Sequence, residues 1–263
     1  MTEIIAIVNQ KGGVGKTTTA INIAACLASA GKKTLLVDAD PQGNSTSGLG
    51  ISKQNLKENF YHFLINEDVS LEDVIMETPV PDLHLIPTNR DMLGIDQELM
   101  EFEKKESRLK SFFDKKLAIT DNNCKYDFII IDSPPNLNIL SINIMVAATR
   151  IIIPTQPEYM PLEGLADLID TYKRIRETLN NRLSILGVLI TMHMSTNNLS
   201  KEVTQNLREN MGSIVFDTVI PKNVRLAEAP SFCLPIIMYD PKSAGSISYQ
   251  AVTKEILART AIS

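Results

Sequence analysis

The chain has 263 residues, of which 44% are hydrophobic, so it is long enough to bury a substantial core. Its formal net charge of −5 excludes a strongly basic protein whose overall field attracts nucleic acid. Three cysteines without a CxxC spacing favour a reduced compartment over a disulfide framework. The chain opens without a signal-peptide pattern and has no apolar run of the ~18 residues that span a membrane, so we expect a cytoplasmic protein without a membrane partner.

Short apolar runs alternate with segments of helical periodicity along the chain. The expected strands are residues 4–8, 34–37, 83–86, 128–131, 151–153 and 185–190, and most are apolar on consecutive residues, as strands buried on both faces are. Helices are expected over 17–30, 162–175 and 246–259, a polar loop over 41–50, and peripheral helices within the charged segments 51–82 and 92–125. This alternation predicts an α/β fold, with a three-layer, mostly parallel twisted sheet flanked by helices, in a single domain over residues 1–263.

The first expected strand leads into a glycine-rich turn and a helix start, which is the arrangement of a phosphate-binding loop. Gln10 stands where the plain pattern GxxxxGK[ST] has its first glycine, but residues 11–17 match the variant KGGxGK[ST]. A turn that only joined strand to helix would explain the glycines, but not two lysines and a threonine at these positions. We expect Lys16 to reach the β- and γ-phosphates of ATP and Thr17 to offer its hydroxyl to Mg²⁺. The expected nucleotide-binding residues of the loop are Lys11, Gly12, Gly13, Val14, Gly15, Lys16, Thr17 and Thr18.

Carboxylates follow two of the expected strands at the edge where open α/β sheets bind ligands. Asp38 and Asp40 end the strand 34–37, and Asp132 ends the strand 128–131. An apolar strand that ends in aspartate is the usual support for Mg²⁺ beside a phosphate loop. Each aspartate could instead cap a following turn or helix, but three of them with a phosphate loop make that reading less favourable. We expect Asp132 to support the metal and Asp40 to position water, while Asp38 is the weakest case and could simply brace the loop.

Several motifs together resemble the ParA/Soj partitioning ATPases, a deviant Walker A branch of the P-loop NTPases that also contains MinD. They are KGGVGKTTTAINIA, LLVDADPQGNSTSGLG, IIIDSPP, LEGL and IPKNVRLAEAPS, in this order. The resemblance implies an ATP-driven sandwich homodimer that hydrolyses ATP slowly, with Lys11 crossing to the partner's phosphates. It assigns catalytic roles to Lys11, Lys16 and Asp40, metal binding to Thr17 and Asp132, and a place beside adenine to Pro221.

The resemblance also implies non-specific DNA binding by the dimer, with Arg225 as a contact, and stimulation of hydrolysis by a ParB/Spo0J-type partner. A nucleoid-associated protein is therefore expected. Arg225 could instead pair with Glu228, three residues further along a helix. The loop of residues 192–198 lacks the arginine that Soj relatives often place there, and Cys233-Leu234 replaces their usual Gly-Lys, so positive charge is missing near the presumed DNA face.

Three other functions share parts of this pattern. A MinD-like membrane-associated ATPase needs a basic amphipathic C-terminal helix, whereas residues 246–259 read as an ordinary packed helix. An electron-transfer iron protein needs paired cysteines near a dimer axis, and Cys124 has no second cysteine at useful spacing. An ATP-gated regulator of replication initiation with negligible turnover has almost the same motifs, and the sequence leaves it open.

Overall fold

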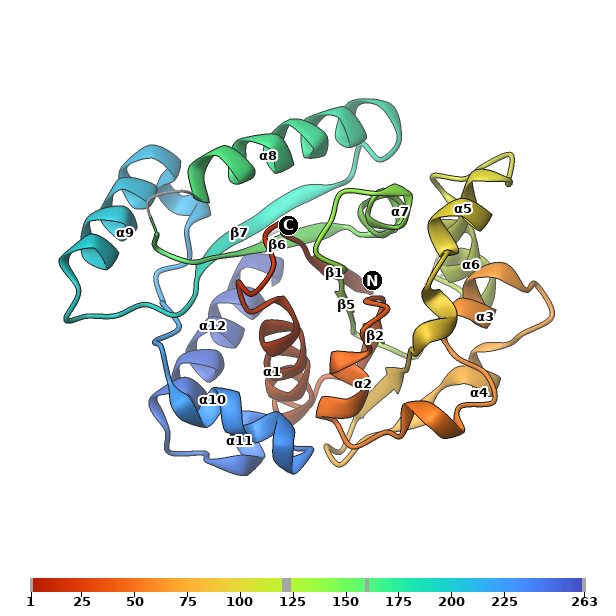
Figure 1. The fold of residues 1–263 in the computed structure, drawn as a ribbon, viewed down its shortest axis with the longest axis horizontal. Helices are drawn as coiled ribbons and strands as arrows, with labels where there is room; N and C mark the ends of the chain where they lie inside the picture. Colours follow the sequence, from red (N-terminus) through yellow and green to blue (C-terminus); the bar gives the residue numbers. More distant parts are fainter. Residues whose placement is uncertain (1, 120–123, 159–160, 262–263) are drawn as a thin grey trace.

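The computed structural model describes residues 2–119, 124–158 and 161–261. In these residues, strands form one central sheet with helices on both sides (Figure 1). The strands are β1 Glu3–Ile7, β2 Thr34–Asp38, β3 Met76–Glu77, β4 Leu83–Ile86, β5 Phe128–Asp132, β6 Arg150–Thr155 and β7 Ser184–Ile190. Their spatial order is β3-β4-β2-β5-β1-β6-β7, and every pair is parallel except β3 with β4. The predicted mostly parallel sheet is confirmed.

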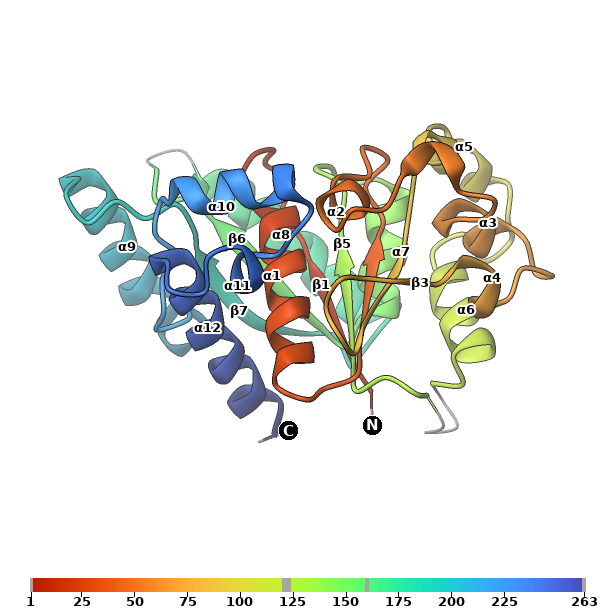
Figure 2. The same ribbon diagram turned by 90° about the horizontal axis from the view of Figure 1, so that it is seen from below.

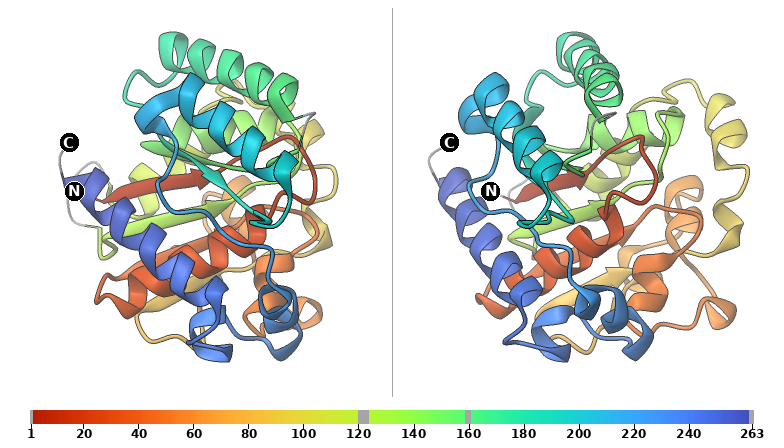
Figure 3. Two further views of the ribbon diagram at one scale, coloured as in Figure 1. Left: turned by 90° about the vertical axis from the view of Figure 1, so that its left-hand side faces the viewer. Right: turned by 60° about the vertical axis from the view of Figure 1, so that its left-hand side comes forward.

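The helices form two layers, one on each face of the sheet (Figure 2). They are α1 Lys16–Ser29, α2 Asn44–Gly48, α3 Phe60–Ile65, α4 Leu71–Val74, α5 Ile95–Met100, α6 Arg108–Lys116, α7 Ile139–Ala147, α8 Pro161–Thr178, α9 Asn198–Met211, α10 Val224–Glu228, α11 Ile236–Tyr239 and α12 Ala244–Ala261. Helices α1 and α12 cover one face, and α7 and α8 cover the other (Figure 3), with α5 and α6 packed against α7 and α3 packed against α6. No helix in the described ranges is long and apolar enough to cross a membrane.

Alternate residues of the central strands point to opposite layers, so each layer has its own apolar core. In β1, Ile4 and Ala6 join the core beneath α7 and α8, whereas Ile5 and Ile7 join the core beneath α1 and α12. Both cores are fully buried at these positions, which explains why the strand is apolar on consecutive residues. The side chain of Leu162, in the predicted helix 162–175, lies outside the described part of the chain; Leu165, further along that helix, is buried.

Two segments differ from the sequence-based expectation. Residues 41–50, predicted as a loop, contain the short helix α2, which begins after Gly43 and is held by Asp38, whose carboxylate accepts a hydrogen bond from the Thr46 amide. Residues 51–82, predicted as peripheral helices, also contain β3, in which Met76 pairs with Leu85 at the edge of the sheet. Two residues are too few to show the period-two pattern from which strands are predicted.

The register of the central strands places the two motif-bearing carboxylate strands side by side. Asp38 at the end of β2 pairs with Asp132 at the end of β5, and Asp132 pairs on its other side with Ile7 of β1. Because these strands are parallel, their carboxyl ends meet at one edge of the sheet, where the loop between β1 and α1 also lies.

Candidate functional site

The loop between β1 and α1 contains two glycines in the left-handed backbone region. Gly13 has φ 76° and Gly15 has φ 88°, a conformation that side chains with a Cβ rarely adopt. Gly15 directly precedes the first residue of α1, so the chain turns sharply into the helix. The glycines of the predicted phosphate loop are therefore explained by the backbone path itself.

Two backbone carbonyl groups of this loop accept hydrogen bonds from side chains of other loops. The Gln156 side chain donates to Gly13 O at 2.9 Å, and the Thr191 hydroxyl donates to Val14 O at 2.8 Å. By contrast, within the described part of the chain the backbone amides of residues 12–18 donate to no protein group. A row of unpaired amides at a helix N-terminus, where the helix dipole is positive, is an anion-binding arrangement.

Lys16 lies almost buried at the first position of α1, with 7% of its surface exposed. Its ammonium group donates to Lys11 O at 3.0 Å. Burial lowers the pKa of Lys16, and the nearby carboxylates of Asp132 and Asp40 oppose that shift. The predicted phosphate-contacting lysine thus lies between the glycine loop and the carboxylates.

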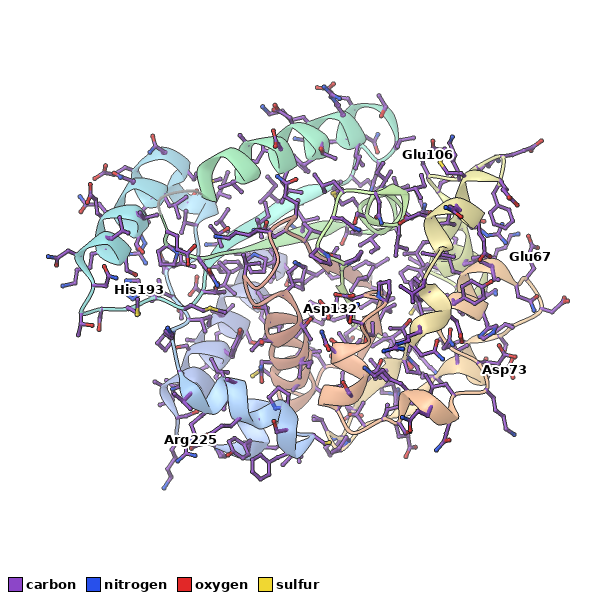
Figure 4. The ribbon with its side chains drawn as sticks, in the orientation of Figure 1. Glu67, Asp73, Glu106, Asp132, His193 and Arg225 are labelled. Atoms are coloured by element: carbon purple, nitrogen blue, oxygen red, sulfur yellow. The ribbon has the colours of Figure 1, made fainter. Side chains whose placement is uncertain are left out.

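Asp132 is fully buried at the end of β5, at the centre of the view in Figure 4. Its Oδ2 accepts a hydrogen bond from the Ser45 hydroxyl at 2.8 Å, whereas Oδ1 is buried without a partner in the described residues. Burial raises the pKa of Asp132; the Ser45 hydrogen bond, the nearby Thr17 hydroxyl and the charge of Lys16 oppose this shift, and the Asp40 carboxylate adds to it. The predicted metal residues Thr17 and Asp132 are therefore together in the structure.

The carboxylate at the end of β2 and the one just beyond it have different surroundings. Asp38 is fully buried and accepts hydrogen bonds from the amide and the hydroxyl of Thr46, at 2.7 and 2.6 Å. Burial, followed by repulsion from Asp132, raises the pKa of Asp38. Asp40 accepts from the Gln42 amide at 2.9 Å and is 8% exposed, so it lies nearer the surface than Asp38. Asp38 thus braces α2, as its weaker assignment anticipated, and Asp40 lies on the loop beyond it.

Lys11 is turned away from its own loop. Its ammonium group forms an ion pair with Glu158 at 2.7 Å, and both side chains are largely exposed. A pocket of about 500 Å³ lies beside this pair and is lined by residues of the phosphate loop, of the turn after β5 and of the segment after β6, among them Gln10, Asn136 and Gln156. Lys11 therefore lies at the rim of an open pocket beside the loop.

Two predicted residues belong to elements other than the phosphate loop. Arg225 lies on α10, at the lower left of Figure 4. It forms ion pairs with Glu228 at 2.9 Å and with Asp240 at 3.6 Å. The alternative partner considered from the sequence, Glu228, is thus the one that Arg225 contacts. Pro221 forms a backbone bridge with His193, in the loop that follows β7.

Four residues of this site were not found from the sequence. Ser45 lies on α2, inside the quoted motif of residues 35–50, but no role was assigned to it. Gln156, Glu158 and Thr191 come from loops distant in the chain, and none belongs to a motif with a known spacing to the phosphate loop. Gln156, Glu158 and Thr191 each follow the carboxyl end of a predicted strand, β6 or β7. That position is the one signal that points to them.

Comparisons with known proteins give sequence relatives of one family and a wider set of proteins with the same fold. The model of a family described as an AAA domain matches residues 2–185. The sporulation initiation inhibitor protein Soj of Bacillus subtilis is 46% identical over 258 residues, which cover 98% of this chain and 99% of that protein. The chromosome partitioning protein ParA of Caulobacter vibrioides is 43% identical over 256 residues, which cover 97% of this chain and 94% of that protein. A solved structure of cobyrinic acid a,c-diamide synthase from Mycobacterium smegmatis, with bound ADP and magnesium, has a TM-score of 0.84 at 30% identity and covers 99% of this chain and 96% of that one.

Proposed function

This chain belongs to the ParA/Soj family of chromosome-partitioning ATPases, and we propose that residues 10–18 bind the triphosphate of ATP together with Mg²⁺. The observation that carries this proposal is the row of unpaired amides of residues 12–18 beside carbonyls that already have partners. Amides in this state suit an anion with many acceptor oxygens. In the proposed complex, Lys16 exchanges its bond to Lys11 O for the β- and γ-phosphates, and Pro221 lies beside the adenine.

The residues around Asp132 fit a magnesium ion. Within the described residues Asp132 Oδ1 is a buried oxygen without a partner, the Thr17 hydroxyl lies near the Asp132 carboxyl group, and oxygen atoms are the ligands that Mg²⁺ takes. Thr17 and Asp132 would hold the ion, and Ser45 would fix the second carboxylate oxygen. When bound, the ion neutralises charge that develops on the phosphate oxygens during transfer.

Hydrolysis is proposed to depend on Asp40 and on a second copy of the chain. Asp40, beyond the end of β2, would orient the attacking water and accept its hydrogen bond. Lys11 would leave Glu158 and reach the phosphates of the partner copy, adding positive charge only once the dimer exists. Because the Lys11–Glu158 pair is exposed to water, little free energy opposes this exchange.

The dimer is proposed to bind DNA without sequence preference and to be released when a ParB/Spo0J-type partner stimulates hydrolysis. Two copies double every basic contact, so the affinity for DNA would depend on ATP. Arg225 is proposed as one contact, although it must first loosen its pairs with Glu228 and Asp240. We propose that residues 1–263 act as one domain in this cycle and that the protein is associated with the nucleoid.

Two variants test these roles by size-exclusion chromatography with ATP and Mg²⁺. Asp40→Ala should accumulate as an ATP-bound dimer because the water is no longer oriented. Lys11→Ala should bind nucleotide but stay monomeric, while Lys110→Ala, an exposed lysine on α6, should behave like the parent. A monomeric Asp40→Ala variant that hydrolyses ATP at the parent's rate would contradict the assigned roles.

A further inference from the structure

The β5–α7 loop, residues 133–138, is held at both ends. At its start, Ser133 is 2% exposed and its hydroxyl donates to Ile7 O at 2.7 Å. At its end, the Asn138 side chain caps α7 by accepting a hydrogen bond from the Ser141 amide at 3.0 Å. The middle of the loop is exposed, so its path depends on how these two ends are held.

Helix α5 supplies a second hold on the end of this loop. Asp96, in the first turn of α5, accepts a hydrogen bond from the Asn138 side-chain amide through Oδ2 and from the Leu140 amide through Oδ1, the latter at 3.2 Å. The Leu140 amide belongs to the first turn of α7, where amides have no partner within the helix and the helix dipole favours a carboxylate. Helix α5 packs against α7, beside which it lies in Figure 1. One carboxylate thus ties the end of the β5–α7 loop to a helix 42 residues earlier in the chain.

Asp96 decides how the Asn138 side chain is turned. An amide group has a donor side and an acceptor side, whereas a carboxylate only accepts, so Asp96 selects the orientation in which Asn138 Oδ1 faces the Ser141 amide. Ser141 passes this constraint on, because its hydroxyl donates to Asn136 O in the exposed middle of the loop. A continuous chain of hydrogen bonds therefore runs from α5 to Asn136.

The far end of this chain lies beside the phosphate loop. Asn136 lines the pocket of about 500 Å³ at whose rim Lys11 lies. Lys11 is the residue proposed to act on the phosphates of a second copy, so the walls around it belong to the surface that the second copy approaches. A wall that is fixed in advance loses less conformational entropy when the two copies close. The residues proposed to hold ADP in one copy, 12–18, are not part of this chain of hydrogen bonds.

We propose that Asp96 is a positioning residue for ATP hydrolysis, which acts through Asn138 and Ser141 on the β5–α7 loop. This role rests on the proposed function, because it concerns the step in which two copies close over ATP. Disturbing the chain of hydrogen bonds should lower kcat, since the loop must then be ordered during each closure. It should leave the affinity for ADP unchanged, since residues 12–18 make those contacts.

An exchange of the two side chains tests the pair. Asp96→Asn leaves two amide groups facing each other, so one of the two hydrogen bonds of Asp96 is lost, and Asn138→Asp brings two carboxylates together. In the double variant Asp96→Asn/Asn138→Asp the donor and the acceptor are exchanged, so the hydrogen bonds to each other, to Leu140 N and to Ser141 N can all form again. The matched control is Asp170→Asn on α8, which removes only an exposed ion pair with Lys173.

Phosphate release in ATP and Mg²⁺ gives kcat, and calorimetric titration with Mg-ADP gives the affinity and counts the folded sites. A variant that merely unfolds more readily loses sites but keeps kcat per site. Asp96→Asn and Asn138→Asp should each lower kcat per site about three- to tenfold, as expected for loss of one hydrogen bond, while the affinity for ADP stays within about twofold of the parent's. The exchanged pair should recover to within about twofold of the parent's kcat, and Asp170→Asn should match the parent.

Ser141→Ala tests the transmission to Asn136. The change removes the hydroxyl that donates to Asn136 O and keeps the amide that Asn138 caps. Because both changes interrupt one chain, kcat of Asp96→Asn/Ser141→Ala should be no lower than that of the slower single variant.

Three results would overturn the proposed role of Asp96. They are single variants that hydrolyse ATP at the parent's rate, an exchanged pair that stays as slow as the single variants, and effects of Asp96→Asn and Ser141→Ala that multiply. A parent that binds no ADP or hydrolyses no ATP contradicts the proposed function, and this role with it. The parent's behaviour therefore separates the failure of the proposed function from a failure of the positioning role alone.

Discussion

Gly13→Ala tests whether the left-handed turn of the phosphate loop sets its affinity. Gly13 has φ 76°, and a Cβ built there has no heavy atom within 4 Å, so strain of the backbone is the sole penalty. A residue with a Cβ loses about 1–2 kcal/mol in this conformation. If the loop keeps its shape, the free energy of unfolding should fall by about that amount. If the loop of the variant instead relaxes to avoid the strain, the penalty appears on binding, because ADP must restore the left-handed turn. ADP should then bind about 5- to 30-fold more weakly.

Urea unfolding without nucleotide measures the loss of unfolding free energy, and calorimetric titration with Mg-ADP measures the loss of binding free energy. The two losses should add up to about 1–2 kcal/mol. Gly12→Ala is the matched control for stability, because Gly12 has no positive φ and equally open surroundings. Gly12→Ala should therefore unfold like the parent. The reasoning is refuted if Gly13→Ala changes neither quantity, or if Gly12→Ala is destabilised as much as Gly13→Ala.

Three further predictions concern stability and DNA binding. A Cβ on Gly187 would lie 2.4 Å from the Phe216 ring, so Gly187→Ala should lower the free energy of unfolding by about 1–3 kcal/mol in urea. Burial lowers the pKa of Lys116 from 10.5 to about 8. The unfolded chain therefore binds more protons between these pH values, and the parent should gain stability relative to Lys116→Met as pH rises from 8 to 10.5, as followed by thermal melts. Glu228→Gln should strengthen DNA binding in anisotropy titrations by releasing Arg225, and a gain that persisted with Arg225→Ala would contradict this cause.

The phosphate loop could be predicted from the sequence because its chemistry is contiguous. Residues 11–17 carry the glycines, both lysines and the threonine, and the structure places them between β1 and α1 as expected. The carboxylates Asp38 and Asp132 were also found, since each ends a run of consecutive apolar residues, and parallel pairing brings such ends together.

The partners of these groups could not be predicted, because they depend on which strands become neighbours. Thr191 and Gln156 contact the loop across 177 and 143 residues of chain, and the order of β1, β6 and β7 in the sheet decides those contacts. Local spacing succeeded where the contact is local, as for Arg225 and Glu228 on one turn of α10. Local spacing did not predict the second ion pair of Arg225, because its partner Asp240 follows α11 and is distant in the sequence.

The side chains that hold the loop carbonyls have a consequence for ligand affinity. With Gly13 O and Val14 O already tied to Gln156 and Thr191, the turn has its shape before any anion arrives. A preorganised loop loses little conformational entropy on association, so more of the contact energy remains as affinity. A substitution that removes the hydrogen bond from Gln156 or from Thr191 would therefore weaken anion binding by the loop, although it removes no atom that contacts the anion.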